Sequence, residues 1–183
     1  MNPLLSLVFY FIYLQNFTNE NMKNPHRLWY AFFLIILPIA AWIFYHVKKG
    51  KYTNLDVSNR HQRRTLYYFI YSVVVLFIFI QYYLNANWDF EAIYLLLLLI
   101  LMGFSNYLIK SSMHTAFNLF VAALYFSHDI YLGIAWLSLT FLVAITRLIL
   151  KRHTLAEVLM GALLGSIVSI AYLYTRIQIE HSL

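Results

Sequence analysis

Cysteine is absent from this chain of 183 residues, and charged side chains make up only 11% of it. Without cysteine the protein has no disulfide, no thiolate nucleophile and no thiolate metal ligand. So small a charged fraction, beside hydrophobic residues at 62%, would leave a soluble domain of this length with more apolar surface than one core can bury. The composition therefore predicts an integral membrane protein.

Glycine and proline are also rare, with five and three residues. Two of the glycines, Gly161 and Gly165, have the small-xxx-small spacing that lets membrane helices approach closely, so we expect close packing around the last span. The apolar residues form runs near the roughly 20 residues that cross a bilayer as a helix, without the alternation of barrel strands. The sequence predicts an all-α integral membrane bundle of about six transmembrane helices, at residues 28–47, 66–84, 90–109, 116–126, 131–150 and 156–174.

The N-terminal apolar run, "PLLSLVFYFIYL" at residues 3–14, covers little more than half a bilayer. This length favours an interfacial or re-entrant helix over a further span. No basic residue precedes the run and no small-residue cleavage site follows it, so we expect it in the mature protein. We therefore expect residues 1–27 to form an N-terminal apolar segment with a loop, and residues 28–183 to form one membrane-embedded helical domain.

The net charge of +6 is not gathered in a soluble basic domain, so we expect no nucleic-acid partner. Many of the basic residues lie instead in the loop "VKKGKYTNLDVSNRHQRRT". If six helices cross in alternating directions, this loop emerges on the same membrane face as the junctions at residues 110–115 and 151–154. Three polar clusters that are distant in sequence would then share one surface.

Two of these clusters carry helix-capping patterns. In "KSSMHT", Ser111 or Ser112 could cap the next helix, either as a plain N-cap or as part of an anion site made by the helix N-terminus. In "RHTLAE", the pair Thr154 and Glu157 fits a capping box. Alternatively, Glu157 holds one ring nitrogen of His153, one helical turn away, and leaves the other nitrogen basic. A cap and an orienting partner can coexist in one carboxylate.

Arg147 lies inside an apolar run, where a charge is costly. It could extend toward the interface, but such residues more often face a polar cavity or pair with an anion. An arginine, two histidines, a carboxylate and helix N-terminal amides together suit a phosphate. The arginine and amides would neutralise its oxygens, while one histidine attacks phosphorus and the other protonates the leaving group.

These residues resemble a known family. "TRLILKRHTLAE" is similar to the third motif of the type 2 phosphatidic acid phosphatase and vanadium haloperoxidase superfamily, which reads Ser-Arg, five residues, His, three residues, Asp. Arg147, His153 and Glu157 fall on its charged positions with unbroken spacing. "SSMHT" resembles the second motif, Pro-Ser-Gly-His, and places Ser112 and His114 on its Ser and His.

The chain departs from both motifs. Thr146 replaces the usual Ser and Glu157 the usual Asp, which keeps the hydroxyl and the carboxylate. Ser111 replaces Pro, which changes loop stiffness. Met113 replaces Gly and is the largest departure, because glycine lets the backbone approach phosphate closely.

The first motif, Lys, six residues, Arg-Pro, is not present as such. "NRHQRRTLYY" occupies its place, so its arginines are candidates for binding phosphate, with a solvated basic loop as the alternative. Lys110, beside the second motif, could also supply the missing cation. The candidate arginines of the loop are Arg60, Arg63 and Arg64.

The resemblance implies a metal-independent lipid phosphatase without a cofactor, acting on a phosphomonoester or pyrophosphate of a lipid. His153 would attack phosphorus to form a phosphohistidine, Glu157 would orient it, and His114 would protonate the leaving oxygen. Arg147, Ser112 and the cations named above would bind the phosphate. We expect a multi-pass protein of the bacterial inner membrane, with membrane lipids as partners. The identity of the lipid phosphate and the oligomeric state stay open.

The side of the membrane also stays open, because basic loops favour the cytoplasm whereas the resemblance implies an extracytoplasmic site. Two other classes of function remain. A catalytically degenerate relative could bind a lipid phosphate as a scaffold, which Met113 and the altered first motif would favour. A haem-binding electron carrier could use His114 and His153 as axial ligands, and an absorption spectrum would test it.

Overall fold

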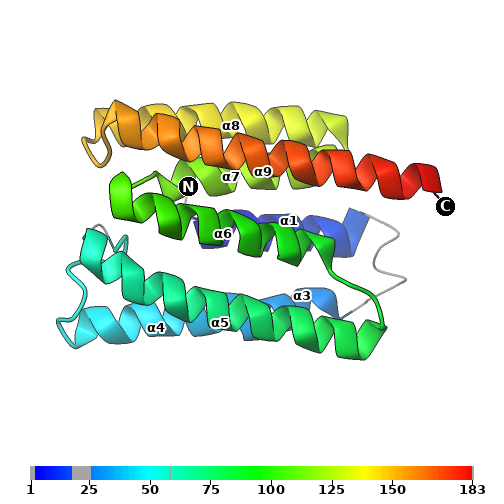
Figure 1. Cartoon of the computed structure of the whole chain (residues 1–183), viewed down its shortest axis with the longest axis horizontal. Coiled ribbons are helices and arrows are strands. Elements are labelled where there is room, and N and C mark those ends of the chain that lie inside the picture. The colour runs from blue at the N-terminus through cyan, green and yellow to red at the C-terminus, as the bar shows by residue number, and fades with distance from the viewer. Residues whose placement is uncertain (1–2, 18–25, 58, 183) are drawn as a thin grey trace. The chain divides into compact units, whose positions relative to one another are not determined.

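The computed structural model describes residues 3–17, 26–57 and 59–182, and within these ranges all regular elements are helices (Figure 1). Five of the described helical stretches are long and apolar enough to cross a membrane. The predicted all-α membrane bundle is therefore confirmed. These candidate spans are Arg27–Lys48, Arg60–Asn85, Phe90–Leu108, Ile130–Ile149 and Leu155–Ile179.

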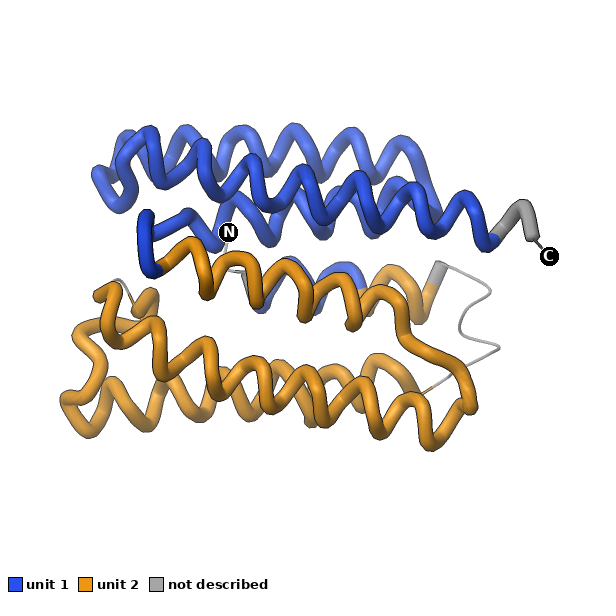
Figure 2. The backbone as a smooth tube through the Cα atoms, viewed as in Figure 1, with its two compact units in different colours: residues 1–10, 107–183 blue, residues 11–106 orange. Residues whose placement is uncertain are grey.

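The chain divides into two compact units (Figure 2). Unit 1 comprises Met1–Tyr10 and Tyr107–Leu183, and unit 2 comprises Phe11–Asn106. The N-terminal helix α1 (Pro3–Phe17) contributes its first part to unit 1 and its second part to unit 2. Unit 1 therefore contains both motif segments, whereas unit 2 contains the basic loop.

Besides the second part of α1, unit 2 contains one long helical stretch made of α3 (Arg27–Ala31), the π-helical turn η1 (Phe32–Ile36) and α4 (Leu37–Lys48). Proline at position 38 explains the π-helical turn before it, because proline donates no backbone hydrogen bond and crowds the preceding turn. A loop then leads to α5 (Arg60–Asn85) and α6 (Phe90–Leu108).

Polar contacts tie the helix ends of unit 2 together. Arg27 Nη2 lies 2.9 Å from a carboxylate oxygen of both Asp89 and Glu91, which joins the start of α3 to the start of α6. At the other end, Asn106 Nδ2 donates to the Arg60 carbonyl at 3.1 Å, and Arg60 Nε donates to the Asn106 carbonyl at 2.5 Å. These two bonds hold the start of α5 against the last turn of α6.

Unit 1 is built around α7 (Met113–Phe126), which packs along α8 (Ile130–Ile149) and α9 (Leu155–Ser182) (Figure 1). Residues of α7 are buried along most of its length. This helix corresponds to the predicted span at residues 116–126, but its 14 residues rise only about 21 Å. It is therefore an inner helix, shorter than the hydrocarbon core of about 30 Å.

The first part of α1 packs inside unit 1. Ser6 Oγ donates to Asn118 Oδ1 of α7 at 2.9 Å, and both residues are buried. The ring of Tyr10 packs edge-on against that of Tyr125, with 5.3 Å between centroids. The N-terminal run is thus a helix shorter than a membrane span, as predicted, and it is anchored to α7.

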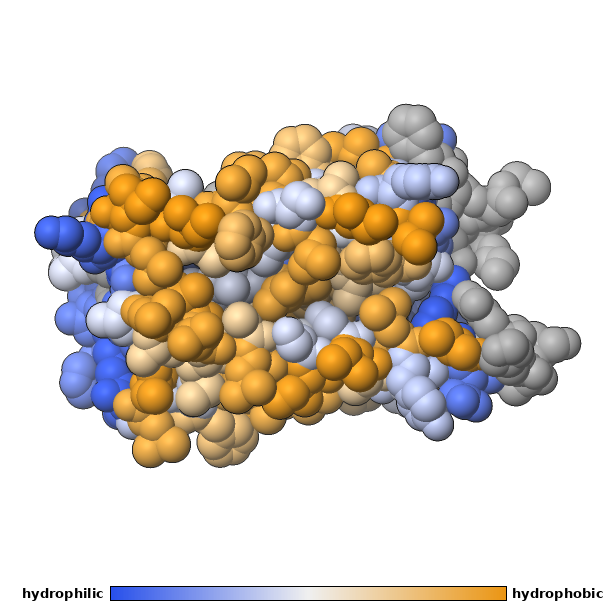
Figure 3. Space-filling model, turned by 90° about the horizontal axis from the view of Figure 1, so that it is seen from above, coloured by the Kyte–Doolittle hydropathy of each residue, from blue (hydrophilic) through white to orange (hydrophobic). Residues whose placement is uncertain are grey.

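Large apolar side chains point outward from α8 and α9. Examples on α9 are Leu159, Leu163 and Ile170, which are all exposed. Figure 3 shows apolar side chains over the middle of the visible face and hydrophilic ones at its left-hand end. Such a surface suits contact with lipid tails, with polar residues at the membrane surface.

Gly161 and Gly165 lie where α9 packs on α7. A Cβ added at Gly161 would lie 2.5 Å from the carbonyl oxygen of Ser112, and one at Gly165 would lie 2.9 Å from that of Ala116. These are backbone atoms, which cannot move aside as the tip of a side chain can. The close approach predicted from the glycine spacing is confirmed, and its partner is α7.

Gly165→Leu should therefore lower the thermal stability of the protein, because a larger side chain would push α9 away from α7. Overpacking typically costs about 1–3 kcal/mol. Thermal unfolding of the detergent-solubilised variant, followed by fluorescence, measures the effect. Leu163→Ala on the exposed face of α9 is the matched control and should change stability little. An unfolding temperature equal to that of the parent would show that the contact is unimportant for stability.

Candidate functional site

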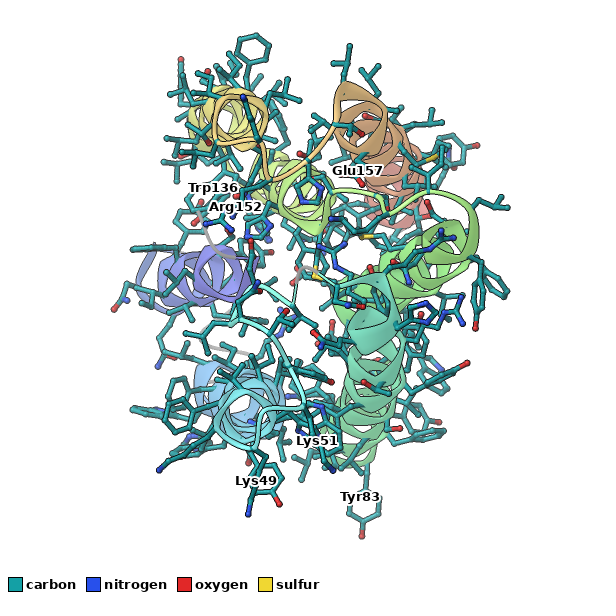
Figure 4. All side chains as sticks on the ribbon, turned by 90° about the vertical axis from the view of Figure 1, so that its left-hand side faces the viewer. Lys49, Lys51, Tyr83, Trp136, Arg152 and Glu157 are labelled. Carbon is teal, nitrogen blue, oxygen red and sulfur yellow. The ribbon has the colours of Figure 1, made fainter. Side chains whose placement is uncertain are left out.

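The site lies at the end of unit 1 where the loop between α8 and α9 meets the N-terminus of α7 (Figure 4). Helix α8 ends in a Schellman motif. Lys151, at φ +50°, reverses the chain, so that the Arg152 N–H donates to the Arg147 carbonyl at 3.0 Å and the Lys151 N–H to the Leu148 carbonyl at 3.0 Å. The His153 N–H also donates to the Arg147 carbonyl, at 3.3 Å. The loop thus returns His153 to the level of Arg147.

The Glu157 carboxylate joins three parts of the site. Its Oε2 accepts the Thr154 N–H at 3.1 Å, and the Glu157 N–H donates to Thr154 Oγ1 at 3.3 Å. The same Oε2 lies 2.8 Å from His153 Nδ1, while Oε1 lies 3.9 Å from Lys110 Nζ. Both predicted contacts of Glu157 are therefore confirmed, because it completes the capping box and holds the histidine at Nδ1.

This contact determines which nitrogen of His153 could react. A carboxylate oxygen only accepts hydrogen bonds, so Nδ1 is the protonated nitrogen of a neutral ring in this position. Any nucleophilic role then falls to Nε2. The His153 side chain is only 2% exposed, whereas that of Glu157 is 18% exposed. The ring is thus shielded from bulk water.

The N-terminus of α7 is bonded directly to α9. Ser112 is the N-cap, and its Oγ accepts from the Thr115 hydroxyl at 3.1 Å. The Ser112 N–H donates to the Glu157 carbonyl at 2.9 Å. The structure thereby brings the second motif against the third, and it selects Ser112 over Ser111 as the cap.

His114 is the second residue of α7 and is buried, with 5% of its surface exposed. Asn118 Nδ2 donates to the His114 carbonyl at 2.7 Å, and Asn118 in turn accepts from Ser6. Asn118 and Ser6 were not among the candidate residues predicted from the sequence. The signal that could have identified Asn118 is its position one turn after His114 within an apolar helix.

Met113 occupies the position of the family's glycine. It is half-buried at the first position of α7, and its φ is not positive. The local backbone therefore needs no glycine for its conformation. The methionine side chain nevertheless occupies space at the helix end that a glycine would leave open.

The loop arginines have structural contacts in unit 2. Arg63 is buried at 4% exposure, and its Nε donates to the Val57 carbonyl at 3.1 Å, so it is not a solvated loop residue. Arg60 bonds Asn106, as described above. Arg64 lies one residue after Arg63, also near the start of α5. Among the predicted cations, only Arg147 and Lys110 belong to the same unit as the histidines.

The fold and the site define an all-α membrane protein in which a half-buried glutamate holds a buried histidine at the end of a membrane helix. No family model, curated protein sequence or solved structure matches the chain. Within the described ranges, no group of three or more His, Asp or Glu side chains is arranged to hold a metal ion. The residues of the site are therefore what indicates its chemistry.

Proposed function

We propose that this protein is a membrane-embedded lipid phosphatase that hydrolyses a phosphomonoester or pyrophosphate of a lipid through a phosphohistidine. One observation carries the proposal, namely the 2.8 Å contact between His153 Nδ1 and Glu157 Oε2. The same glutamate is bonded through its carbonyl to the N-terminus of the helix that bears His114. A carboxylate-held histidine beside a second histidine suits nucleophilic attack followed by proton donation.

In the proposed reaction, His153 Nε2 attacks phosphorus in line with the bond to the lipid oxygen. As the N–P bond forms, the P–O bond breaks and its electron pair leaves with the lipid oxygen, which takes a proton from protonated His114. Glu157 accepts the Nδ1 proton in a hydrogen bond and balances the positive charge that develops on the ring. Water then gives a proton to the now neutral His114 and attacks phosphorus; as the new O–P bond forms, the N–P bond breaks, its electron pair returns to His153 Nε2, and inorganic phosphate is released.

Positive groups around the phosphate would stabilise the negative charge on its oxygens in the transition state, which is the main requirement for catalysing phosphoryl transfer. In unit 1, the proposed hydrogen-bond donors to the phosphate are Arg147 and the first-turn amides of α7. Lys110, whose Nζ lies 3.9 Å from Glu157 Oε1, is a further proposed cation. The resemblance adds Ser112 and the loop arginines as proposed phosphate ligands. The proposal needs no metal ion, because the cationic groups and the histidine nucleophile supply the required charges.

A lipid substrate fits the setting of the site. The helices beside it are apolar and exposed along their outer faces, so acyl or prenyl chains could stay in the bilayer while the phosphate enters from the membrane surface. We propose the bacterial inner membrane as its location. Met113 favours one alternative, a catalytically degenerate relative that binds a lipid phosphate without hydrolysing it.

Phosphate release from purified protein tests the proposal. The detergent-solubilised chain is incubated in EDTA with phosphatidate, phosphatidylglycerol phosphate, a polyprenyl pyrophosphate and a lipid A phosphate, and free phosphate is measured. We expect at least one substrate to be hydrolysed at an undiminished rate in EDTA. Saturable binding of a lipid phosphate without any release would support the scaffold alternative instead. Activity that disappears in EDTA would contradict the metal-independent mechanism.

A further inference from the structure

The two ends of unit 2 differ strongly in charge. At one end, Arg27 is matched by the carboxylates of Asp89 and Glu91, each at 2.9 Å. At the other end, α4 finishes in lysine, and the turn after it carries two more. Asp56 is the only acidic residue between positions 28 and 88. The lysines of this basic end are Lys48, Lys49 and Lys51, which we call the lysine cluster.

The lysine cluster has no carboxylate partner in the part of the chain that the structure describes. All three residues are exposed. Lys49 and Lys51 are labelled at the end of α4 in Figure 4, which looks along the helices from this end. Three neighbouring positive charges without an internal counter-ion favour an external anion.

Aromatic rings place these lysines at the membrane surface. Lys48 Nζ lies 5.9 Å from the ring centroid of Phe44, and Lys49 Nζ lies 5.9 Å from that of Tyr45. The two rings are 60% and 55% exposed on the last turns of an apolar span. Exposed aromatic residues at the end of a span are typical of the headgroup region, where lysines extend along apolar surface and keep their charge in water.

The turn that carries the cluster is held in place from within unit 2. Tyr52 is buried, and its hydroxyl accepts from Trp42 Nε1 at 3.1 Å and lies 2.9 Å from Thr65 Oγ1. The Lys51 N–H donates to the His46 carbonyl at 2.8 Å. The backbone that carries the three lysines, at the end of α4 and in the turn after it, is thus held in place and needs no large rearrangement to meet a ligand.

We propose that the lysine cluster binds the headgroups of anionic phospholipids. The charge complementarity favours this partner, because zwitterionic headgroups carry no net charge to match three adjacent lysines. Each lysine near an anionic membrane surface is expected to strengthen association by about fivefold. The lysine cluster shares no residue with the proposed active site, and its occupancy does not depend on whether the protein hydrolyses phosphate.

Lipid association in bilayers tests this proposal. The full chain is reconstituted in phosphatidylcholine with traces of spin-labelled phosphatidylglycerol or spin-labelled phosphatidylcholine, and electron paramagnetic resonance gives the motionally restricted fraction of each. Phosphatidylglycerol is a phosphodiester, so it is not a phosphomonoester substrate of the proposed enzyme. We expect the parent to prefer phosphatidylglycerol, and the triple variant Lys48→Gln, Lys49→Gln, Lys51→Gln to lose most of that preference, on the order of tenfold or more.

The triple variant with arginine at the same three positions is the matched control, since it keeps the charge and should keep the preference. Thermal unfolding of both variants shows that the fold is intact. A glutamine variant that folds and still prefers phosphatidylglycerol as the parent does would overturn the proposal. Inorganic phosphate should weaken the association no more than chloride at equal ionic strength. Specific competition by inorganic phosphate would identify a phosphate-ion site instead of a lipid-binding surface.

Discussion

His153→Ala should abolish phosphate release, with a loss on the order of 10⁴-fold or more in turnover. The nucleophile contributes directly to the transition state, and Glu157 Oε2 holds its Nδ1 at 2.8 Å. The measurement is free phosphate from the best lipid substrate, under single-turnover and steady-state conditions. Thermal unfolding of the same sample reports whether the variant folds.

The His153 side chain is buried, so its removal could lower stability by itself. His153→Gln fills more of the space and provides a second variant that should be equally inactive. His128→Ala is the matched control, because His128 belongs to the same unit but lies in the turn between α7 and α8, away from the site. It should retain activity. Turnover by folded His153→Ala near the parental rate would refute the phosphohistidine mechanism and leave the scaffold alternative.

Glu157→Gln should reduce turnover by on the order of 10³–10⁴-fold while leaving stability nearly unchanged. The amide oxygen can still accept the Thr154 N–H, so the capping box persists. In the parent the same Oε2 also contacts His153 Nδ1, so the amide oxygen can keep that contact, and the amide nitrogen then takes the place of Oε1 near Lys110. An amide nevertheless carries no negative charge to balance the positively charged ring that forms during attack. Glu157→Asp should keep part of the activity, because it keeps the charge.

Thr154→Ala is the control that separates the two roles of Glu157. It removes the Oγ1 that accepts the Glu157 N–H at 3.3 Å but leaves the carboxylate beside the histidine. Loss of such a cap costs about 1 kcal/mol of stability, so the unfolding temperature should fall while most of the turnover remains. If Glu157→Gln were as active as the parent, the glutamate would serve only as a helix cap.

The sequence predicts local features of this protein well because they depend on short spacings. Bilayer thickness dictates the length of an apolar helix, so the spans were predicted to within a few residues at most ends. The capping box and the histidine–glutamate contact join residues three and four apart on one helical turn, so their geometry follows from the spacing. These are the parts of the site that sequence analysis could name with their partners.

Other parts depend on contacts between distant segments. The bond from the Ser112 N–H to the Glu157 carbonyl and the bond from Ser6 to Asn118 each join separate helices, and no pattern in one helix indicates them. The burial of Arg63 against the Val57 carbonyl is another case, because an arginine in a basic loop looks solvated in the sequence. The helix predicted as a span at residues 116–126 is α7, which is too short to cross the hydrocarbon core, and its apolar side chains are buried against neighbouring helices.

The shortness of α7 also determines how deep the site lies. Helices α7 and α8 share the turn at residues 127–129, and α8 has 20 residues against the 14 of α7. At 1.5 Å per residue, the N-terminus of α7 stops about 9 Å short of the far end of α8. His114 therefore lies below the level of the α8–α9 loop. A headgroup would have to descend toward the acyl chains to meet it, so the thickness of the surrounding bilayer becomes part of the access route.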